Sequence, residues 1–132
     1  MKALLEELND IVEKIKAYGV KLVVLYGSMA RGDYTVESDI DILIVADNFP
    51  RDPRDGYEIV MKYVNPRVHP VCLNTDSFRK LLENESTFIL EILEDGKILY
   101  SDKVFLEETL NKYREVRKKW TRRGKTWIKN MS

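Results

Sequence analysis

Residues 39–45, Asp-Ile-Asp-Ile-Leu-Ile-Val, restrict the possible folds more than any other segment. Charged and aliphatic side chains alternate at first and the run then becomes wholly apolar, which is the pattern of a β-strand with a buried end. Side chains of a strand point alternately to its two faces, so Asp39 and Asp41 share one face, about 6.6 Å apart along the chain. Ile40 and Ile42 then point the other way, into the core. We therefore predict a buried strand that carries two carboxylates at its beginning.

The rest of the chain alternates helical and strand patterns. Apolar residues at three- and four-residue spacing predict a first helix over about 2–18, which Gly19 ends. Pro70 places the third strand at a sheet edge or a bulge, because proline has no N–H for a central ladder. Similar patterns predict strands at 21–26, 67–73 and 97–100, a brief helical turn from Ser28, and helices at about 57–64, 75–82, 87–95 and 103–123. The expected order is a mixture of α and β elements.

Length and composition suit a soluble domain. At 132 residues with 44% hydrophobic content, we expect one domain over 1–132, with a core at about 20–100 and a basic helix and tail at about 103–132. The one cysteine, Cys72, excludes an intramolecular disulfide, and no signal-peptide pattern follows Met1, so a reducing, cytoplasmic setting is expected. Cys72 lies in an apolar stretch and should be core. No run approaches the roughly 20 apolar residues that span a bilayer, so no membrane is expected.

The zero net charge hides an asymmetry. Nine of the 22 basic residues but only one of the 22 acidic residues lie in 112–129, so this tail carries about +8 and the remainder about −8. The tail could contact nucleic acid through phosphates, or dock on an acidic protein. The alternative is a solvated helix end whose cations favour the helix dipole. Apolar residues at helical spacing, Trp120 among them, favour a packed helix over a disordered arm.

Gly27 and Ser28 directly follow the predicted strand at 21–26. Glycine lets the backbone approach a phosphate closely, and the start of a helical turn presents N–H groups to an anion. Mg²⁺ usually takes one or two carboxylates and leaves its other positions to water and substrate phosphates. A phosphate at Gly27 and Ser28 and a metal at Asp39 and Asp41 would meet between the two strands. The alternatives are a turn with a capping serine and a pair of acids that serve solubility.

The stretch from residue 27 to residue 45 is similar to the signature of a known family. Gly27-Ser28, ten intervening residues and Asp39-Ile40-Asp41, embedded in Gly-Ser-Met-Ala-Arg-Gly-Asp and Ser-Asp-Ile-Asp-Ile-Leu-Ile-Val, resemble the minimal nucleotidyltransferases of the DNA polymerase β-like superfamily. The resemblance implies an α+β nucleotidyltransferase fold, with a small mixed sheet of about three to four strands flanked by helices. It also implies that two metals, held by three carboxylates, align a nucleoside triphosphate with an acceptor hydroxyl for in-line attack.

Carried onto this sequence, the resemblance assigns a role to each residue of the motif. Asp39 and Asp41 become catalytic residues and ligands of Mg²⁺ or Mn²⁺. Gly27 and Ser28 become nucleotide-binding residues that hold the terminal phosphates. Arg31 would add positive charge at the same place, the alternative being a solvated surface residue.

The third carboxylate of the family lies on the next strand, where this sequence has Val-His-Pro-Val from residue 68. His69 takes the matching position and is a candidate catalytic residue, although imidazole suits Mn²⁺ or softer metals better than Mg²⁺. A structural or partly exposed histidine is the alternative. Asp76 could substitute for the missing carboxylate, although we expect it mainly to cap a helix. The motif thus supports nucleotide binding more directly than activation of the acceptor.

We predict an enzyme that transfers AMP from ATP to a hydroxyl of a macromolecular acceptor. Many minimal nucleotidyltransferases resemble antitoxins that neutralise an all-helical HEPN-type ribonuclease toxin by adding AMP to a tyrosine, so a HEPN-type protein is the expected partner. Assembly of this chain into a homo-oligomer stays open. One alternative is a non-catalytic nucleotide-binding module that blocks a partner, which His69 favours. The other is an RNA-modifying transferase, which the basic tail at 112–129 would serve.

Overall fold

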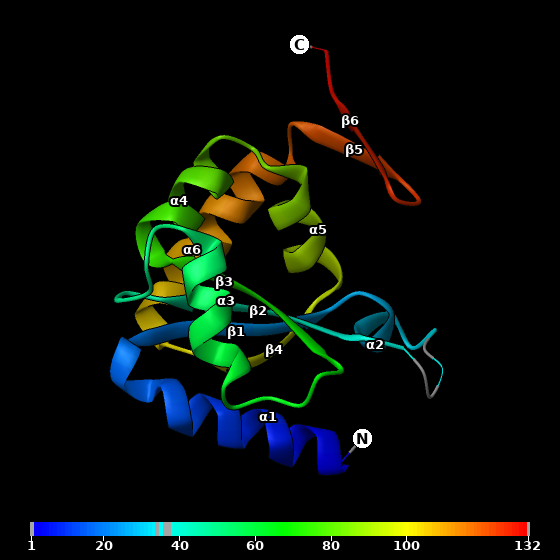
Figure 1. The fold of residues 1–132 in the computed structure, drawn as a ribbon. Coiled ribbons are helices and arrows are strands. Elements are labelled where there is room, and N and C mark those ends of the chain that lie inside the picture. Colours follow the sequence, from blue (N-terminus) through cyan, green and yellow to red (C-terminus); the bar gives the residue numbers. More distant parts are fainter. Residues whose placement is uncertain (1, 34, 36–37, 132) are drawn as a thin grey trace.

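The computed structural model describes residues 2–33, 35 and 38–131. Helices and strands alternate around a central sheet, and a two-stranded hairpin follows the last helix (Figure 1). The elements are α1 (Lys2–Ile15), η1 (Lys16–Tyr18), β1 (Val20–Tyr26), α2 (Ser28–Arg31), β2 (Ile40–Ala46), α3 (Pro53–Met61), β3 (Val68–Asn74), α4 (Thr75–Glu83), α5 (Thr87–Asp95), β4 (Lys97–Ser101), α6 (Lys103–Arg117), β5 (Trp120–Arg123) and β6 (Thr126–Lys129). Within the described ranges, no helix has the length and apolar content to cross a membrane.

Four strands form the central sheet in the order β3-β2-β1-β4. β1 pairs antiparallel with both β2 and β4, whereas β2 and β3 run parallel and are joined through α3. The prediction of a small mixed sheet flanked by helices is confirmed. β3 is an edge strand, so the missing N–H of Pro70 is tolerated there, as the sequence predicts.

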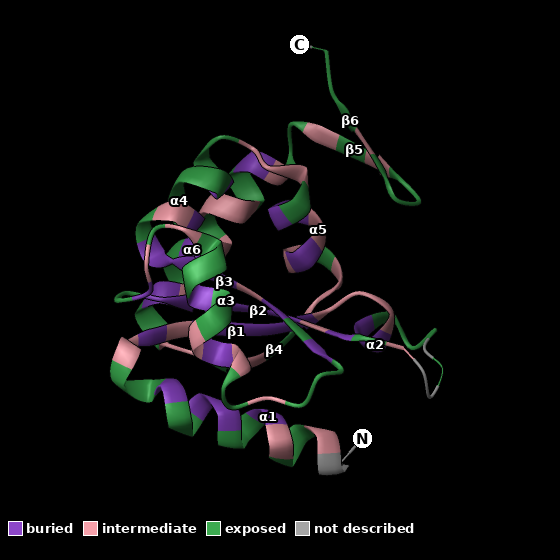
Figure 2. Cartoon of the chain, in the orientation of Figure 1, coloured by how far each residue is buried: buried purple, intermediate pink, exposed green. Residues whose placement is uncertain are grey.

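Helices cover both faces of this sheet. α1 lies along one face, and α4, α5 and α6 cover the other (Figure 1). Ile42 and Ile44 of β2 are buried on the α1 side, whereas Leu43 and Val45 are buried on the side of α4, α5 and α6. Figure 2 shows this burial along the strands and the inner sides of the helices. By the same alternation, Asp41 belongs to the face that α4, α5 and α6 cover.

A capping side chain sets the start of α3. Asp52 accepts a hydrogen bond from the backbone N–H of Arg54 at 3.0 Å, so the helix begins at Pro53 and ends at Met61. The helix predicted at about 57–64 is therefore displaced toward the N-terminus. Pro53 is the first helical residue, where the absence of an N–H costs nothing.

The C-terminal segment differs most from its prediction. The helix expected over about 103–123 ends at Arg117, and residues 120–129 form the β5–β6 hairpin. Gly124 has a φ of +62° in the turn, a left-handed conformation that glycine adopts without strain. Trp120 and Trp127 are partly buried against the core beneath α4, α5 and α6. Tertiary packing therefore overrides the helical spacing of the apolar residues.

Candidate active site

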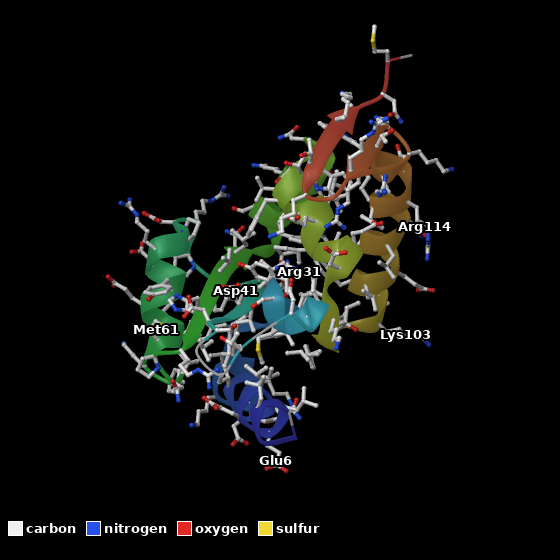
Figure 3. The ribbon with its side chains drawn as sticks, turned by 90° about the vertical axis from the view of Figure 1, so that its right-hand side faces the viewer. Glu6, Arg31, Asp41, Met61, Lys103 and Arg114 are labelled. Carbon is white, nitrogen blue, oxygen red and sulfur yellow. The ribbon has the colours of Figure 1, made fainter. Side chains whose placement is uncertain are left out.

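β2 begins at the end of the sheet beside α2 (Figure 1), where Figure 3 shows Asp41 close to this helix. Asp41 is the second residue of the strand and lies between Tyr26 of β1 and His69 of β3 in the register. Asp39 directly precedes the strand and is exposed, whereas Asp41 is half-buried. The spacing expected from the sequence thus places both acids at an edge that solvent reaches.

Gly27 brings the backbone against one of these carboxylates. Its φ of +71° and ψ of −154° lie in a region that only glycine adopts freely. A Cβ atom on Gly27 would lie 2.5 Å from Oδ2 of Asp41, a separation that real Cβ contacts do not show. α2 begins at the next residue, Ser28, and the first N–H groups of a helix have no acceptor within it. The backbone just before α2 therefore lies beside the Asp41 carboxylate, and Gly27 O accepts the N–H groups of Ala30 and Arg31.

Arg31 is the last residue of α2. Its Nε donates to Oδ2 of Asp33 at 3.3 Å. Figure 3 shows Arg31 and Asp41 on the same side of the molecule. Arg31 also lines a cavity of about 120 Å³ between α2 and α5. The other residues around this cavity are Tyr26, Gly27, Glu91, Ile92 and Asp95.

The electrostatics at Asp41 favour a cation. Burial raises the pKa of Asp41 above its usual value and the charge of Asp39 also raises it, whereas His69 and Arg31 lower it. Burial, together with the charge of Asp41, raises the pKa of Tyr26 to about 12. A divalent cation beside the two carboxylates would relieve their repulsion and favour their charged forms.

His69 occupies the neighbouring position on β3. Its Nε2 is 3.2 Å from Oδ1 of Asp39, and half of its side chain is exposed. Across the described part of the chain, no three His, Cys, Asp or Glu side chains are close enough to share a metal ion. The oxygens of Asp39 and Asp41 are of the hard type that Mg²⁺ or Mn²⁺ takes, and a site with one or two carboxylates would leave other positions to water and phosphate oxygens. These residues do not form the three-carboxylate arrangement that the family resemblance implies.

Asp76 lies at the wrong end of β3 to replace the missing carboxylate. β2 and β3 run parallel, with Asp41 beside His69 and Ala46 beside Asn74. At about 3.3 Å per residue, the strand separates Asn74 from His69 by roughly 16 Å. Asp76 follows in the first turn of α4, where its charge favours the helix dipole and where Asn74 is the cap. The expectation that Asp76 could serve as the third carboxylate is therefore wrong.

Cys72 plays no part in this chemistry. It is buried in β3, and burial raises the pKa of its thiol to about 12. Because the thiolate is the nucleophilic form of cysteine, Cys72 is unreactive at neutral pH and belongs to the core, as the sequence predicts.

No pattern in the sequence marks four residues at or beside the cavity: Tyr26, Glu91, Asp95 and Arg122. Tyr26 is the last residue of β1 and directly precedes Gly27, so its place beside the turn is the signal that the sequence carries. Glu91 and Asp95 are four residues apart and share a face of α5, but their spacing does not reveal that this face turns toward Gly27. Arg122 donates to Asp95 through Nη1 and Nη2, at 2.8 and 2.6 Å. That contact depends on the hairpin, which the helical spacing conceals.

Comparison with known proteins connects this arrangement to a family. The profile described as Polymerase beta, Nucleotidyltransferase matches residues 6–105, which include the turn at Gly27 and both Asp39 and Asp41. A proposed protein adenylyltransferase of Methanocaldococcus jannaschii is 36% identical over 100 residues. The match covers 75% of this chain and 96% of that protein.

Two solved structures share the fold. A chain from a toxin–antitoxin complex with AMP-PNP has a TM-score of 0.55 at 19% identity, covering 86% of this chain and 90% of that chain. A chain from the complex of tri-AMPylated Shewanella oneidensis HEPN toxin with MNT antitoxin has a TM-score of 0.50 at 20% identity, covering 89% of this chain and 91% of that chain. At these identities the likeness concerns the fold alone.

Proposed function

This chain belongs to the polymerase beta nucleotidyltransferase family, and we propose that it transfers AMP from ATP to a hydroxyl of a partner protein. The observation that carries the proposal is the convergence of Asp39, Asp41 and Gly27 at one end of the sheet, with Arg31 beside them. Two carboxylates that repel each other can bind a cation, and the backbone N–H groups next to them can bind a phosphate. The name of the M. jannaschii relative supports AMP as the group and a protein as the acceptor.

In this proposal each group of the site has one task. Asp39 and Asp41 hold Mg²⁺ or Mn²⁺, which when bound supplies positive charge to the phosphate oxygens. The Gly27 backbone, the Ser28 hydroxyl and the N–H groups at the start of α2 hold the terminal phosphates. Arg31 adds a charge-assisted hydrogen bond to the same oxygens.

The transfer is an in-line displacement at the α-phosphorus. The acceptor oxygen forms a bond to that phosphorus, the bond to the bridging oxygen breaks, and pyrophosphate leaves with the electron pair. The hydroxyl proton must pass to a base, and His69 is half exposed beside Asp39. If Nε2, which lies 3.2 Å from Asp39, carries the N–H of the neutral imidazole, Nδ1 is free to accept the proton. We therefore assign the acceptor to the His69 side of the site.

The proposal extends to the partner. One structural neighbour comes from an MNT antitoxin complex with an AMPylated HEPN toxin. We propose that an all-helical HEPN-type protein presents the acceptor hydroxyl to this chain as well, which would make the chain an antitoxin.

Labelling of the partner tests the proposed transfer. The chain is incubated with the protein encoded by the neighbouring gene and with ATP labelled at the α-phosphate, in Mg²⁺ or in Mn²⁺. We expect labelled partner and released pyrophosphate, and the double variant Asp39→Asn, Asp41→Asn should produce neither. The double variant Asp55→Asn, Asp76→Asn makes the same charge change at exposed positions and should keep the activity. A partner that binds the chain but is never labelled would overturn the proposal.

A second function, a module that binds nucleotide and blocks its partner without catalysis, is favoured by His69 in place of a carboxylate. His69→Asp distinguishes the two functions. Transfer that depends on Mn²⁺ in the wild type and proceeds with Mg²⁺ in His69→Asp supports the enzyme. ATP binding without pyrophosphate release in either protein, with the partner present, supports the module.

An RNA acceptor has less support from the structure. The basic residues of 112–129 that form ion pairs are Lys112, Arg117, Lys119, Arg122 and Lys129. Most of their acidic partners lie on α5 or just before it, so much of the positive charge is neutralised within the chain. Strongly salt-dependent RNA binding would be needed to favour an RNA substrate.

A further inference from the structure

The hairpin contacts α5 through a salt bridge at the edge of the cavity. Nη1 and Nη2 of Arg122 donate to the two oxygens of Asp95 at 2.8 and 2.6 Å, and Nη2 lies 3.5 Å from Oε1 of Glu91. The Arg122 side chain is only 16% exposed, and its Nε donates to the backbone oxygen of Gly124 at 2.7 Å. The guanidinium carbon also lies 5.4 Å from the ring centre of Trp127. The hairpin therefore holds this cation in one place.

The carboxylates that Arg122 binds also line the proposed nucleotide site. Glu91 and Asp95 border the cavity of about 120 Å³ together with Gly27 and Arg31. Arg122 is the main cause that lowers the pKa of Asp95, and the charge of Arg31 lowers it further, so Arg31 is within electrostatic range of Asp95. Unpaired carboxylates here would repel a triphosphate and attract Arg31.

We propose that Arg122 is a positioning residue of the nucleotide site, which neutralises Asp95 and so leaves Arg31 to bind phosphate. The inference rests on the proposed function, since a nucleoside triphosphate is the ligand that needs Arg31. It gives the hairpin, which lies beyond the residues that the family profile matches, a part in nucleotide binding. Without Arg122, the negative charge of Asp95 competes with the phosphates for Arg31, which already donates to Asp33, and phosphate binding weakens.

Calorimetric titration of the full chain with ATP and Mg²⁺, without a partner, tests this role. Arg122→Ala should weaken ATP binding by about five- to tenfold, the effect expected from one unit charge several ångströms away in a partly aqueous site. The matched control is Arg123→Ala, an adjacent, exposed residue of the same strand with the same loss of charge. Solvent and salt screen an exposed charge, so the control should change the affinity by less than about twofold.

A further substitution separates neutralisation from two other roles. If Arg122 acts on Asp95, the double variant Arg122→Ala, Asp95→Asn should regain most of the wild-type affinity. A double variant that binds ATP as weakly as Arg122→Ala would show that Arg122 does not act through Asp95, which overturns the proposal. If Arg122→Ala shifts the tryptophan emission but binds ATP as tightly as Arg123→Ala, Arg122 only holds the hairpin in place, and this result also overturns the proposal.

The wild-type titration separates this inference from the proposed function. A wild-type chain that binds no ATP with Mg²⁺ or with Mn²⁺ overturns both. A wild-type chain that binds ATP, together with an Arg122→Ala variant of equal affinity, overturns the role of Arg122 alone.

Discussion

Replacement of Gly27 by alanine tests whether the turn and the carboxylate belong to one site. The φ of +71° and ψ of −154° at Gly27 cost a residue with a Cβ about 1–3 kcal/mol. The new Cβ would also lie 2.5 Å from Oδ2 of Asp41, so the carboxylate must turn away or the turn must open. We expect the free energy of unfolding to fall by about 1–3 kcal/mol, and ATP binding with Mg²⁺ to weaken by about tenfold or more, since a shift of 1.4 kcal/mol is already tenfold.

Gly32→Ala is the matched control at the other end of α2. Gly32 has a φ of +84° and a ψ of 5°, and no heavy atom lies within 4 Å of the place its Cβ would take. The left-handed conformation costs alanine roughly 1–2 kcal/mol, so both variants should lose stability in urea unfolding followed by circular dichroism. Only Gly27→Ala should lose affinity in calorimetric titration. If the two variants bind ATP equally well, the contact between Gly27 and Asp41 is not part of the nucleotide site and the argument fails.

Three further predictions concern charge and packing. Asp41→Asn should raise the free energy of unfolding at pH 7, because burial raises the pKa of Asp41 and so disfavours its charged form in the fold. In urea titrations below the ordinary pKa of 3.8, where Asp41 is protonated in both states, this gain in stability should disappear. A variant less stable than the wild type at pH 7 would contradict this prediction. Phe78→Ala should lower the free energy of unfolding by about 3–5 kcal/mol, because Phe78 is fully buried, and a loss under about 1 kcal/mol would refute its place in the core. A hydrogen bond from Trp120 lowers the pKa of Glu85 in the folded protein, so the hairpin should be fully docked above the ordinary pKa of 4.5. As the pH falls through the lower pKa that Glu85 has in the fold, docking should weaken, and tryptophan emission should change. Glu85→Gln should show the same change in emission already at neutral pH.

The strands that carry the site were predictable because their signals are local. The predicted strands at 21–26 and 39–45 agree with β1 and β2 to within a residue. A short apolar run that ends at a glycine, and an alternation of acids with aliphatic residues, are both signals of a strand that depend only on neighbouring residues. The i and i+2 spacing of Asp39 and Asp41 determines which face they share in any strand. Pro70 marked an edge strand because proline lacks an N–H, a property that does not depend on the neighbours.

The side of the cavity that α5 and the hairpin form depends on contacts that the spacing of residues in the sequence does not encode. Val116 and Trp120 are four residues apart, a spacing that suits a continuing helix, yet Trp120 donates through Nε1 to Glu85, 35 residues away. Arg122 bonds to Asp95 across 27 residues, and Lys129 reaches Glu85 across 44. Such pairs join the hairpin to α5 and to Glu85 just before that helix, which are far from it in the sequence. A signature within residues 27–45 can therefore identify the side that binds phosphate and metal, whereas the charges that face it across the cavity are determined by how α5 and the hairpin pack.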